Sequence, residues 1–430
     1  MNTFVHLNVH SHYSKGWGVG TTEELCQAAR EGGMDRLALT DTNSLYGLDF
    51  FVQAAKEVGI KPIVGSELVT DKRRALLLVK NPLGYANLSR MISHCHCHQA
   101  FDLLQTLKEH RNGLIVLSDD FKLLKVLKRN SIEDLFVEMS PGYRMAQCYA
   151  FSRRTEIPPV ATNRVCLIRK DQFQLHRILR AISLNSKLSR LPSEEICREH
   201  NVLNPPQAMI DQFPHAPVAI DNTLKIAEAC LSDWDFSRVI FPYFEDMDDE
   251  EAFHRLYHAT LEGCRRRYGK ITLPVRERVA HEMQIIREKN FAHYFLVVAD
   301  ITQKAQRSCG RGSAAASIVS YALGITHVDP IRHNLFFERF LNPGRMDPPD
   351  IDVDFAWDER DQIIDYVFAK YGNRRAAMVA NHNTFGARAA IREVAKVFGL
   401  TEQEIGRVTD KVGFHWHLGS SWRDLPRHPK

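Results

Sequence analysis

The first half of the chain alternates short apolar runs with amphipathic segments of helical periodicity. The apolar runs, each of strand length, cover residues 4–10, 36–40, 62–69, 75–80, 113–118, 134–139 and 159–162. Strands that alternate with helices are typical of βα units around a parallel sheet or barrel. About seven such units in roughly 200 residues favour a compact βα barrel, with functional groups at the carboxyl ends of its strands.

Two of the intervening segments carry recognisable helix start and stop signals. Thr21 and Glu24 form the Thr-x-x-Glu pattern of a capping box at the start of a helix over residues 21–30. A second helix is predicted over residues 50–58, where Gly59 supplies a stop signal. Both helices therefore have predicted bounds.

The composition and the positions of the prolines indicate a soluble chain of more than one domain. Prolines recur between residues 190 and 245, which predicts a domain boundary there, and 430 residues are enough for two or three domains. With 44% hydrophobic and 25% charged residues, disorder and a small disulfide scaffold are excluded. No apolar run reaches the ~18 residues of a membrane span, and no signal peptide is recognisable. We expect a cytoplasmic protein without a membrane partner.

Aspartates alternate with apolar residues near position 352. Asp350, Asp352 and Asp354 are separated by Ile351 and Val353, the period of a strand with one apolar face. The carboxylates would project from the other face about 6–7 Å apart, where a divalent cation can offset their repulsion. From the spacing alone, a metal site and a charged strand edge that deters aggregation are equally good interpretations.

A glycine-containing turn precedes this strand. Residues 309–316 read Cys-Gly-Arg-Gly-Ser-Ala-Ala-Ala, and Ser313 is the predicted cap of a long helix that ends near Gly324. Glycines let the backbone approach a ligand, and a helix start offers unpaired N–H groups to phosphate, although such a turn alone is more often structural. Arg339 and Arg345 lie between the turn and the aspartates. This combination suits nucleotidyl transfer better than any one part does.

These motifs together resemble a known family. Residues 310–313 (Gly-Arg-Gly-Ser), 320–326 (Ser-Tyr-Ala-Leu-Gly-Ile-Thr) and 349–355 (Pro-Asp-Ile-Asp-Val-Asp-Phe) are similar to the palm of bacterial C-family DNA polymerases. That family comprises the alpha subunits of DNA polymerase III and their error-prone relatives. The sequence of residues 346–361 is slightly more similar to the error-prone branch.

The resemblance implies a DNA polymerase site that uses Mg²⁺, a DNA primer-template and deoxynucleoside triphosphates. Its catalytic, metal-binding residues would be Asp350 and Asp352. Its nucleotide- and phosphate-binding residues would be Gly312, Ser313, Arg339 and Arg345. Asp354 matches a third acidic position of the motif, to which no catalytic role is normally assigned.

The N-terminal half resembles the PHP domain that these polymerases carry, a distorted βα barrel. His10, His12 and Glu67 stand at metal-ligand positions of that family. Departures from the family's ligand pattern occur at Trp17, residues 40–42, Arg74 and residues 163–166. The resemblance therefore implies a degenerate metal site, at which bound metal is doubtful and phosphoesterase activity is not expected.

We expect an α/β chain of three parts. These are a PHP-like βα barrel over residues 1–235, a partial nucleotidyltransferase-like α+β palm over 245–380 and the start of a helical thumb over 381–430. The family's members are more than twice as long and carry a third catalytic aspartate downstream, so this portion alone is not expected to polymerise DNA. In the intact protein a sliding clamp and other replisome or translesion subunits are expected partners. Two alternatives stay open: a non-catalytic DNA-binding or scaffold remnant, and a PHP-type phosphoesterase.

Overall fold

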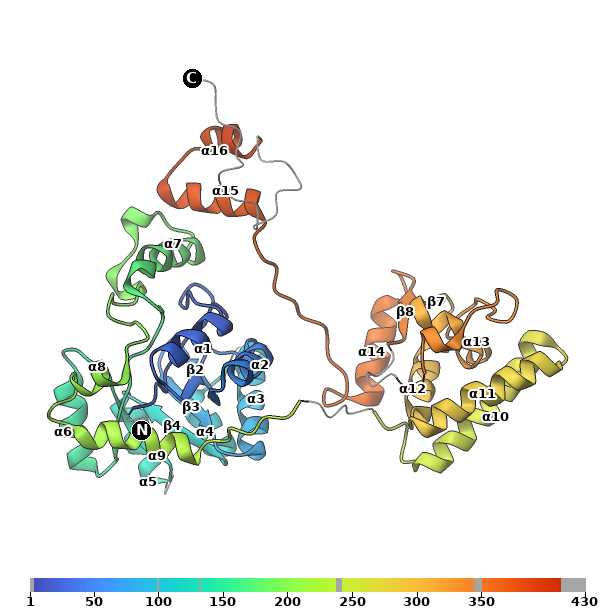
Figure 1. Cartoon of the computed structure of the whole chain (residues 1–430), viewed down its shortest axis with the longest axis horizontal. Coiled ribbons are helices and arrows are strands. Elements are labelled where there is room, and N and C mark those ends of the chain that lie inside the picture. Colours follow the sequence, from blue (N-terminus) through green and yellow to red (C-terminus); the bar gives the residue numbers. More distant parts are fainter. Residues whose placement is uncertain are drawn as a thin grey trace. The chain divides into compact units, whose positions relative to one another are not determined.

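The structure is a computed structural model that describes residues 4–98, 100–130, 133–236, 242–342, 344 and 350–410. The chain divides into two compact units (Figure 1). The first unit takes residues up to 235 together with those from 383 onward, and the second takes residues 236–382. Each unit has a hydrophobic core of its own.

The first unit is built on a six-stranded sheet whose strand order follows the sequence. Its strands are β1 (Arg36–Leu39), β2 (Lys61–Val69), β3 (Arg74–Val79), β4 (Leu114–Ser118), β5 (Leu135–Met139) and β6 (Pro159–Ala161). Three pairings are parallel, but β3 runs antiparallel to both β2 and β4. The sheet is therefore mixed, and β3 departs from the parallel arrangement that βα units suggest, because residues 70–73 are too short a link for a crossover.

The predicted strand over residues 4–10 is not regular. This segment is buried beside β1, and within it only Val9 forms a bridge, to Val165. The backbone N–H of Val9 donates to the side-chain hydroxyl of Thr40 at 2.8 Å instead of to a strand carbonyl. A side chain has thus taken one of the bonds that a continuous ladder would need.

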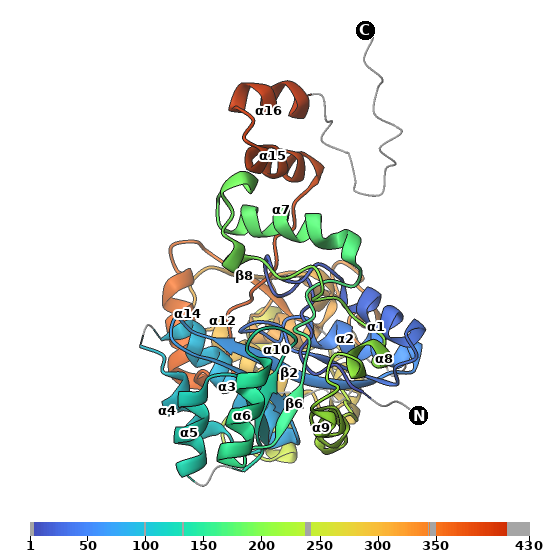
Figure 2. The ribbon, with the colours of Figure 1, turned by 90° about the vertical axis from the view of Figure 1, so that its left-hand side faces the viewer.

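Helices cover the sheet of the first unit (Figures 1 and 2). They are α1 (Thr22–Glu31), α2 (Leu48–Val58), α3 (Pro82–Cys97), α4 (Leu103–His110), α5 (Phe121–Arg129), α6 (Met145–Thr155), α7 (Phe173–Ser183), α8 (Pro206–Ile210) and α9 (Pro217–Ala229). Short 3₁₀ helices are η1 (Lys170–Gln172), η2 (Leu188–Arg190) and η3 (Ser193–Glu195). The predicted capping box of Thr21 and Glu24 is confirmed at the start of α1. Gly59 ends α2 in a left-handed conformation, as predicted.

Two helices from the end of the described chain also belong to the first unit. They are α15 (Ala387–Phe398) and α16 (Glu402–Thr409), and α15 packs against α7, as Figure 2 shows. Within the described residues, no helix combines the length and the apolar character that crossing a bilayer requires.

The second unit is mainly helical and contains a two-stranded antiparallel sheet. Its elements are α10 (Asp249–Tyr268), α11 (Leu273–Glu288), α12 (Ala292–Thr302), β7 (Ser308–Arg311), η4 (Gly312–Ala316), α13 (Ile318–Leu323), η5 (Phe337–Arg339), β8 (Asp352–Phe355) and α14 (Arg360–Tyr371). A Cβ atom on Gly263 would lie 2.1 Å from the carbonyl oxygen of Ala322. Only glycine therefore allows α10 and α13 to pack so closely.

The long helix predicted to run from Ser313 to Gly324 is wrong. A 3₁₀ turn, η4, comes first, Ser317 is extended, and only then does α13 begin. The hydroxyl of Ser317, not that of Ser313, caps the helix by accepting from the backbone N–H of Ser320. Serine favours such a helix start because its hydroxyl can bond a backbone N–H in place of a helical carbonyl.

Candidate active site

The predicted aspartate strand is present as β8. It pairs with β7 so that Arg311 lies opposite Asp352 and Cys309 opposite Asp354. Asp352 and Asp354 are exposed, whereas Val353 packs against the core of the second unit. The predicted alternation is confirmed, and the carboxylates of this strand face solvent.

The glycine turn lies directly beside these carboxylates. Gly312 has a φ of +70°, and a Cβ atom placed on it would be 3.8 Å from Oδ2 of Asp352. The guanidinium of Arg311 lies between two carboxylates of β8. Its Nη1 is 3.9 Å from Oδ2 of Asp352, and its Nε is 3.2 Å from Oδ1 of Asp354. Ser313 is exposed on the following turn, η4. The pairing of β7 with β8 thus brings the predicted phosphate turn to the predicted metal carboxylate.

A buried glutamate that was not predicted from the sequence holds the end of this turn through hydrogen bonds. The carboxylate of Glu282 on α11 accepts the hydroxyl of Ser317 at 2.7 Å and the backbone N–H groups of Ile318 and Val319 at 3.0 and 3.3 Å. Burial raises the pKa of Glu282, and the bonds to its carboxylate oppose that rise. Glu282 therefore satisfies N–H groups that the start of α13 would otherwise leave unpaired.

Arg278 extends this support by one helical turn. Its Nε donates to Glu282 at 2.6 Å, and its Nη2 donates to the backbone carbonyls of Ala316 and Leu335 at 2.8 and 2.9 Å. One guanidinium thus ties α11 to η4 and to the segment before η5. The sequence signal for this pair was a glutamate among the apolar positions Val275, Val279 and Met283 of one helix face.

Tyr294 on α12 supports the aspartates from the core side. Its hydroxyl oxygen accepts the backbone N–H of Ile351 at 3.1 Å. Burial raises the pKa of Tyr294, and the negative charges of Asp350 and Asp352 raise it further. Both predicted catalytic carboxylates are thus close enough to act on the same phenol.

The two predicted phosphate-binding arginines have different outcomes. Arg339 is exposed on η5, and η5 packs against η4, the turn that carries Ser313. Arg345 lies outside the described residues. The helix that carries Arg339 therefore packs beside the glycine turn.

The carboxylates at β8 are ligands that suit a hard cation, one that retains several of its bound water molecules. No cluster of three or more His, Cys, Asp or Glu side chains placed to hold a metal occurs in the described part of the chain. Mg²⁺ commonly takes one or two carboxylates, with water and substrate phosphate completing its shell. Exposed carboxylates at Asp350 and Asp352, beside a glycine without a side chain, fit that preference.

In the barrel, arginines surround the predicted metal ligand Glu67. This carboxylate is fully buried, 2.5 Å from Nε of Arg74 and 3.3 Å from Nη2 of Arg164. Nε2 of His10 lies 3.6 Å from the same carboxylate. Burial alone would raise the pKa of Glu67, but the charges of Arg164 and Arg74 outweigh it and hold that pKa far below its usual range.

Arg74 joins three carboxylates that face one another. Besides Glu67, its guanidinium contacts Glu138 at 2.6 Å and Asp119 at 3.0 Å. Burial disfavours the charge, but the three carboxylates together raise the pKa of Arg74 well above its usual value. The guanidinium of Arg74 thus compensates Glu67, the one acidic group here that the PHP resemblance assigns to a metal, together with Glu138 and Asp119.

Of the two predicted barrel histidines, only His10 joins this cluster. His10 is buried, with Nδ1 3.0 Å from the hydroxyl of Ser14, whereas His12 is exposed and its ring packs on Tyr13. Residues 10–12 do not form a regular strand, so the spacing of His10 and His12 does not place both rings in the buried cluster.

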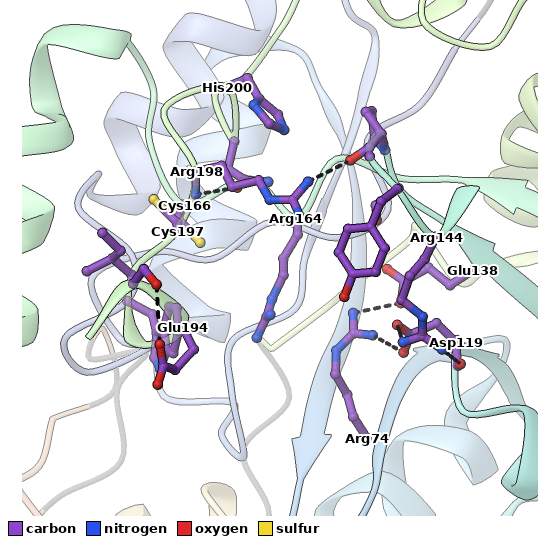
Figure 3. Close-up of a pocket in the computed structure, with 18 of the residues that line it drawn as sticks. Arg74, Asp119, Glu138, Arg144, Arg164, Cys166, Glu194, Cys197, Arg198 and His200 are labelled. Atoms are coloured by element: carbon purple, nitrogen blue, oxygen red, sulfur yellow. Dashed lines mark hydrogen bonds and ion pairs between the residues drawn. The ribbon is translucent and has the colours of Figure 1, made fainter. Parts of the chain in front are cut away.

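A pocket of about 430 Å³ opens beside Arg74 (Figure 3). Arg144 and Arg164 line it together with Glu138, and Trp17 forms part of its wall. The guanidinium carbon of Arg164 is 5.2 Å from the centre of the Trp17 ring, within the range of a cation–π contact. Arginine and tryptophan side chains thus shape the cavity at this place in the barrel.

Two family profiles match the chain. The PHP domain profile matches residues 6–136, and the profile of the bacterial DNA polymerase III alpha NTPase domain matches residues 254–426. An error-prone DNA polymerase of Symbiobacterium thermophilum is 33% identical over 97% of this chain and 43% of its own length. A DNA polymerase III subunit alpha of Bacillus subtilis is 34% identical over 95% of this chain and 40% of its own length.

These matches run through both units described above and include β7, β8 and the barrel strands β1 to β4. The chain spans about two fifths of the length of the curated relatives it matches. The chain therefore carries a PHP domain followed by a bacterial DNA polymerase III alpha NTPase domain, and along nearly its whole length it is similar to DNA polymerase III alpha subunits and error-prone DNA polymerases.

Proposed function

We propose that this chain is part of a DNA-directed DNA polymerase that transfers nucleotides in replication or damage-tolerant synthesis. The supporting observation is the pairing of β7 with β8, which sets the left-handed Gly312 beside the carboxylate of Asp352. Phosphate cradle and metal carboxylate are adjacent in that arrangement, as nucleotidyl transfer requires.

In this proposal Asp350 and Asp352 hold Mg²⁺. When bound, the metal supplies charge stabilisation and makes the primer 3′-hydroxyl more acidic. The backbone of Gly312 and the hydroxyl of Ser313 orient the incoming triphosphate, and the guanidinium of Arg339 offsets phosphate charge. Arg345, outside the described residues, is proposed for the same task.

Two buried groups act as positioning residues in this proposal. Glu282 holds the start of α13 behind the glycine turn, and Tyr294 holds Ile351 between the two aspartates. Neither touches the triphosphate. Rigid support of this kind keeps reacting groups within the small tolerance that transfer chemistry allows.

The metal assignment can be tested on this chain directly. Mn²⁺ can be titrated in the presence of a deoxynucleoside triphosphate and followed by electron paramagnetic resonance. We expect Asp352→Asn to weaken Mn²⁺ binding about tenfold or more, because it removes one of few charged ligands. Asp354→Asn is the matched control, since it lies on the same exposed strand face and should leave binding almost unchanged. Equal effects of both substitutions would contradict the assignment.

The polymerase assignment needs the protein as its source cell makes it. In primer extension by that protein, we expect Asp350→Asn and Asp352→Asn each to abolish synthesis while Asp354→Asn retains it. Normal extension by either of the first two variants would remove these residues from the catalytic site. We propose a sliding clamp and other replisome or translesion subunits as its partners.

We propose that residues 1–235 serve as a structural PHP barrel, 245–380 as the palm and 381–430 as the start of the thumb. The arginine contacts of Glu67 and Glu138 support the structural role, because a metal there would have to displace Arg74. We expect no Mn²⁺- or Zn²⁺-dependent 3′ exonuclease activity. Such an activity, present in the chain and lost in His10→Ala, would instead favour a working metal site.

A further inference from the structure

Two cysteines line the pocket beside Arg74. Cys166 follows the bridge residue Val165, and Cys197 lies just after η3 (Figure 3). Both thiols are free, and the two residues belong to the same small buried cluster. Cys197 is 8% exposed, at the edge of a cavity wide enough for a small oxidant.

Backbone bonds hold the two cysteine segments together. The N–H of Cys166 donates to the carbonyl of Asn201 at 3.0 Å, and the N–H of Asn201 donates to the carbonyl of Arg198 at 2.9 Å. The N–H of Cys197 donates to Nε2 of His176 at 2.9 Å. The loop that carries Cys197 is therefore fastened across the segment that carries Cys166.

The two thiols differ in acidity although they are neighbours. A hydrogen bond from the Cys166 thiol lowers the pKa of Cys197 to about 6; burial opposes this shift, and the charge of Arg164 adds to it. The same bond, together with burial, raises the pKa of Cys166. Cys148 lines the same pocket, yet burial raises its pKa to about 11. One nucleophilic thiolate thus stands beside one protonated thiol.

We propose that Cys166 and Cys197 form a peroxide-sensitive pair that closes to a disulfide on the pocket wall. The sulfur of Cys197 attacks one oxygen of hydrogen peroxide, the O–O bond breaks, and the departing hydroxide takes a proton to leave as water. Cys197 becomes a sulfenic acid. The sulfur of Cys166 then attacks that sulfur, the S–O bond breaks, and a second water leaves with the proton of Cys166.

Closure of the disulfide requires movement of the two cysteine side chains. Sulfur atoms in a disulfide are about 2 Å apart, closer than in a thiol–thiol hydrogen bond, so the side chains must rotate toward each other. Residues 196–201 form no helix or strand, and backbone bonds already hold this loop against the segment that carries Cys166. Oxidation would cross-link this loop to the barrel and fix one wall of the pocket.

The test uses the whole chain, freed of reductant and treated at neutral pH with one equivalent of hydrogen peroxide. Mapping of unreduced peptides should show the peptide with Cys166 joined to the peptide with Cys197, and the intact mass should fall by two hydrogen atoms. Oxidation confined to the exposed Cys97 and Cys309, or a disulfide that involves Cys148, would overturn the proposal.

Variants resolve the order of steps. In Cys166→Ser, Cys197 should stop at the sulfenic acid and react with dimedone, whereas Cys148→Ser should form the disulfide at the normal rate. In the unmodified chain, Cys197 should react about a hundredfold faster than Cys148, because its thiolate is populated at pH 7. Equal rates for these two thiols would contradict the proposal even if a variant failed to fold.

Discussion

At the scale of single residues, the buried ion pairs of Arg74 should contribute measurably to the free energy of unfolding. Arg74→Met would leave the carboxylates of Glu67 and Glu138 buried without their main cation. Removing one partner of a buried ion pair typically costs about 3–5 kcal/mol. We expect a loss of that size in the free energy of unfolding of the first unit, measured by urea titration at pH 7.

The neighbouring arginine provides the control. Arg73 pairs with Asp120 at 3.1 Å, but both side chains are partly exposed. Such pairs contribute about 0–1 kcal/mol, so Arg73→Met should change the stability little. If both substitutions cost the same, Arg74 is not the residue that compensates the buried carboxylates.

A second residue-scale prediction concerns acid stability. Burial lowers the pKa of His6 from 6.5 to about 4, while its bond to the carbonyl of Asn204 opposes that shift. The unfolded chain therefore binds a proton in this pH range that the folded chain does not, and stability falls as the pH drops from 6.5 to 4. At 1.36 kcal/mol per pKa unit, His6 accounts for about 3 kcal/mol of that loss.

We expect His6→Gln to flatten the pH dependence of the free energy of unfolding between pH 6.5 and 4. Some slope should remain, because burial also lowers the pKa of His10. The exposed His12 gives the matched variant, and His12→Gln should keep the full slope. A slope in His6→Gln as steep as in the unmodified chain would show that His6 titrates normally in the folded state.

At the scale of elements, the start of α13 depends on one carboxylate from α11. Glu282→Ala would remove the acceptor for the backbone N–H groups of Ile318 and Val319. We expect hydrogen exchange in the peptide 312–324 to become at least about tenfold faster, because this local opening would cost less free energy. Mass spectrometry of exchange measures this region directly.

Glu277 lies on the same helix, α11, and is exposed, so Glu277→Ala is the appropriate control. It should leave exchange in peptide 312–324 unchanged. Faster exchange throughout the second unit of Glu282→Ala, without a larger effect at this peptide, would indicate general destabilisation in place of the local role.

Sequence patterns predicted these elements well where local chemistry decides. The strands β1 to β6 were predicted to within two residues of their observed ends, and alternation correctly placed Asp352 and Asp354 on the exposed side of β8. Patterns failed where a distant side chain intervenes. The Thr40 hydroxyl binds the backbone N–H of Val9, and Glu282 binds N–H groups at the start of α13, within the helix predicted after Ser313.

The candidate site shows the same division. The aspartates and the glycine turn were visible because their types and spacing are local features of residues 310–355. The support from Glu282 and Tyr294 was not, because each acts on residues that are distant in sequence and meet only after folding. In the barrel, the sequence indicated the loss of ligands at Arg74 but not that this arginine would join three carboxylates.

At the scale of the whole molecule, the division into two units, each with hydrophobic clusters of its own, predicts two unfolding events. The core around Phe4 and Phe151 lies in the first unit, and the core around Phe295 and Phe337 lies in the second. A unit with its own core can unfold as a cooperative unit. We therefore expect two transitions in differential scanning calorimetry of the chain.

The two stability variants assign these transitions. Arg74→Met should lower the midpoint of one transition and leave the other in place, and Glu282→Ala should do the reverse, because their contacts lie in different units. A loss of about 3 kcal/mol in a unit of this size shifts its midpoint by roughly 6–12 °C, which calorimetry resolves easily. If both variants moved the same transition by similar amounts, the two cores would be unfolding as one cooperative unit, and the stability of the barrel would then bear directly on the candidate polymerase site.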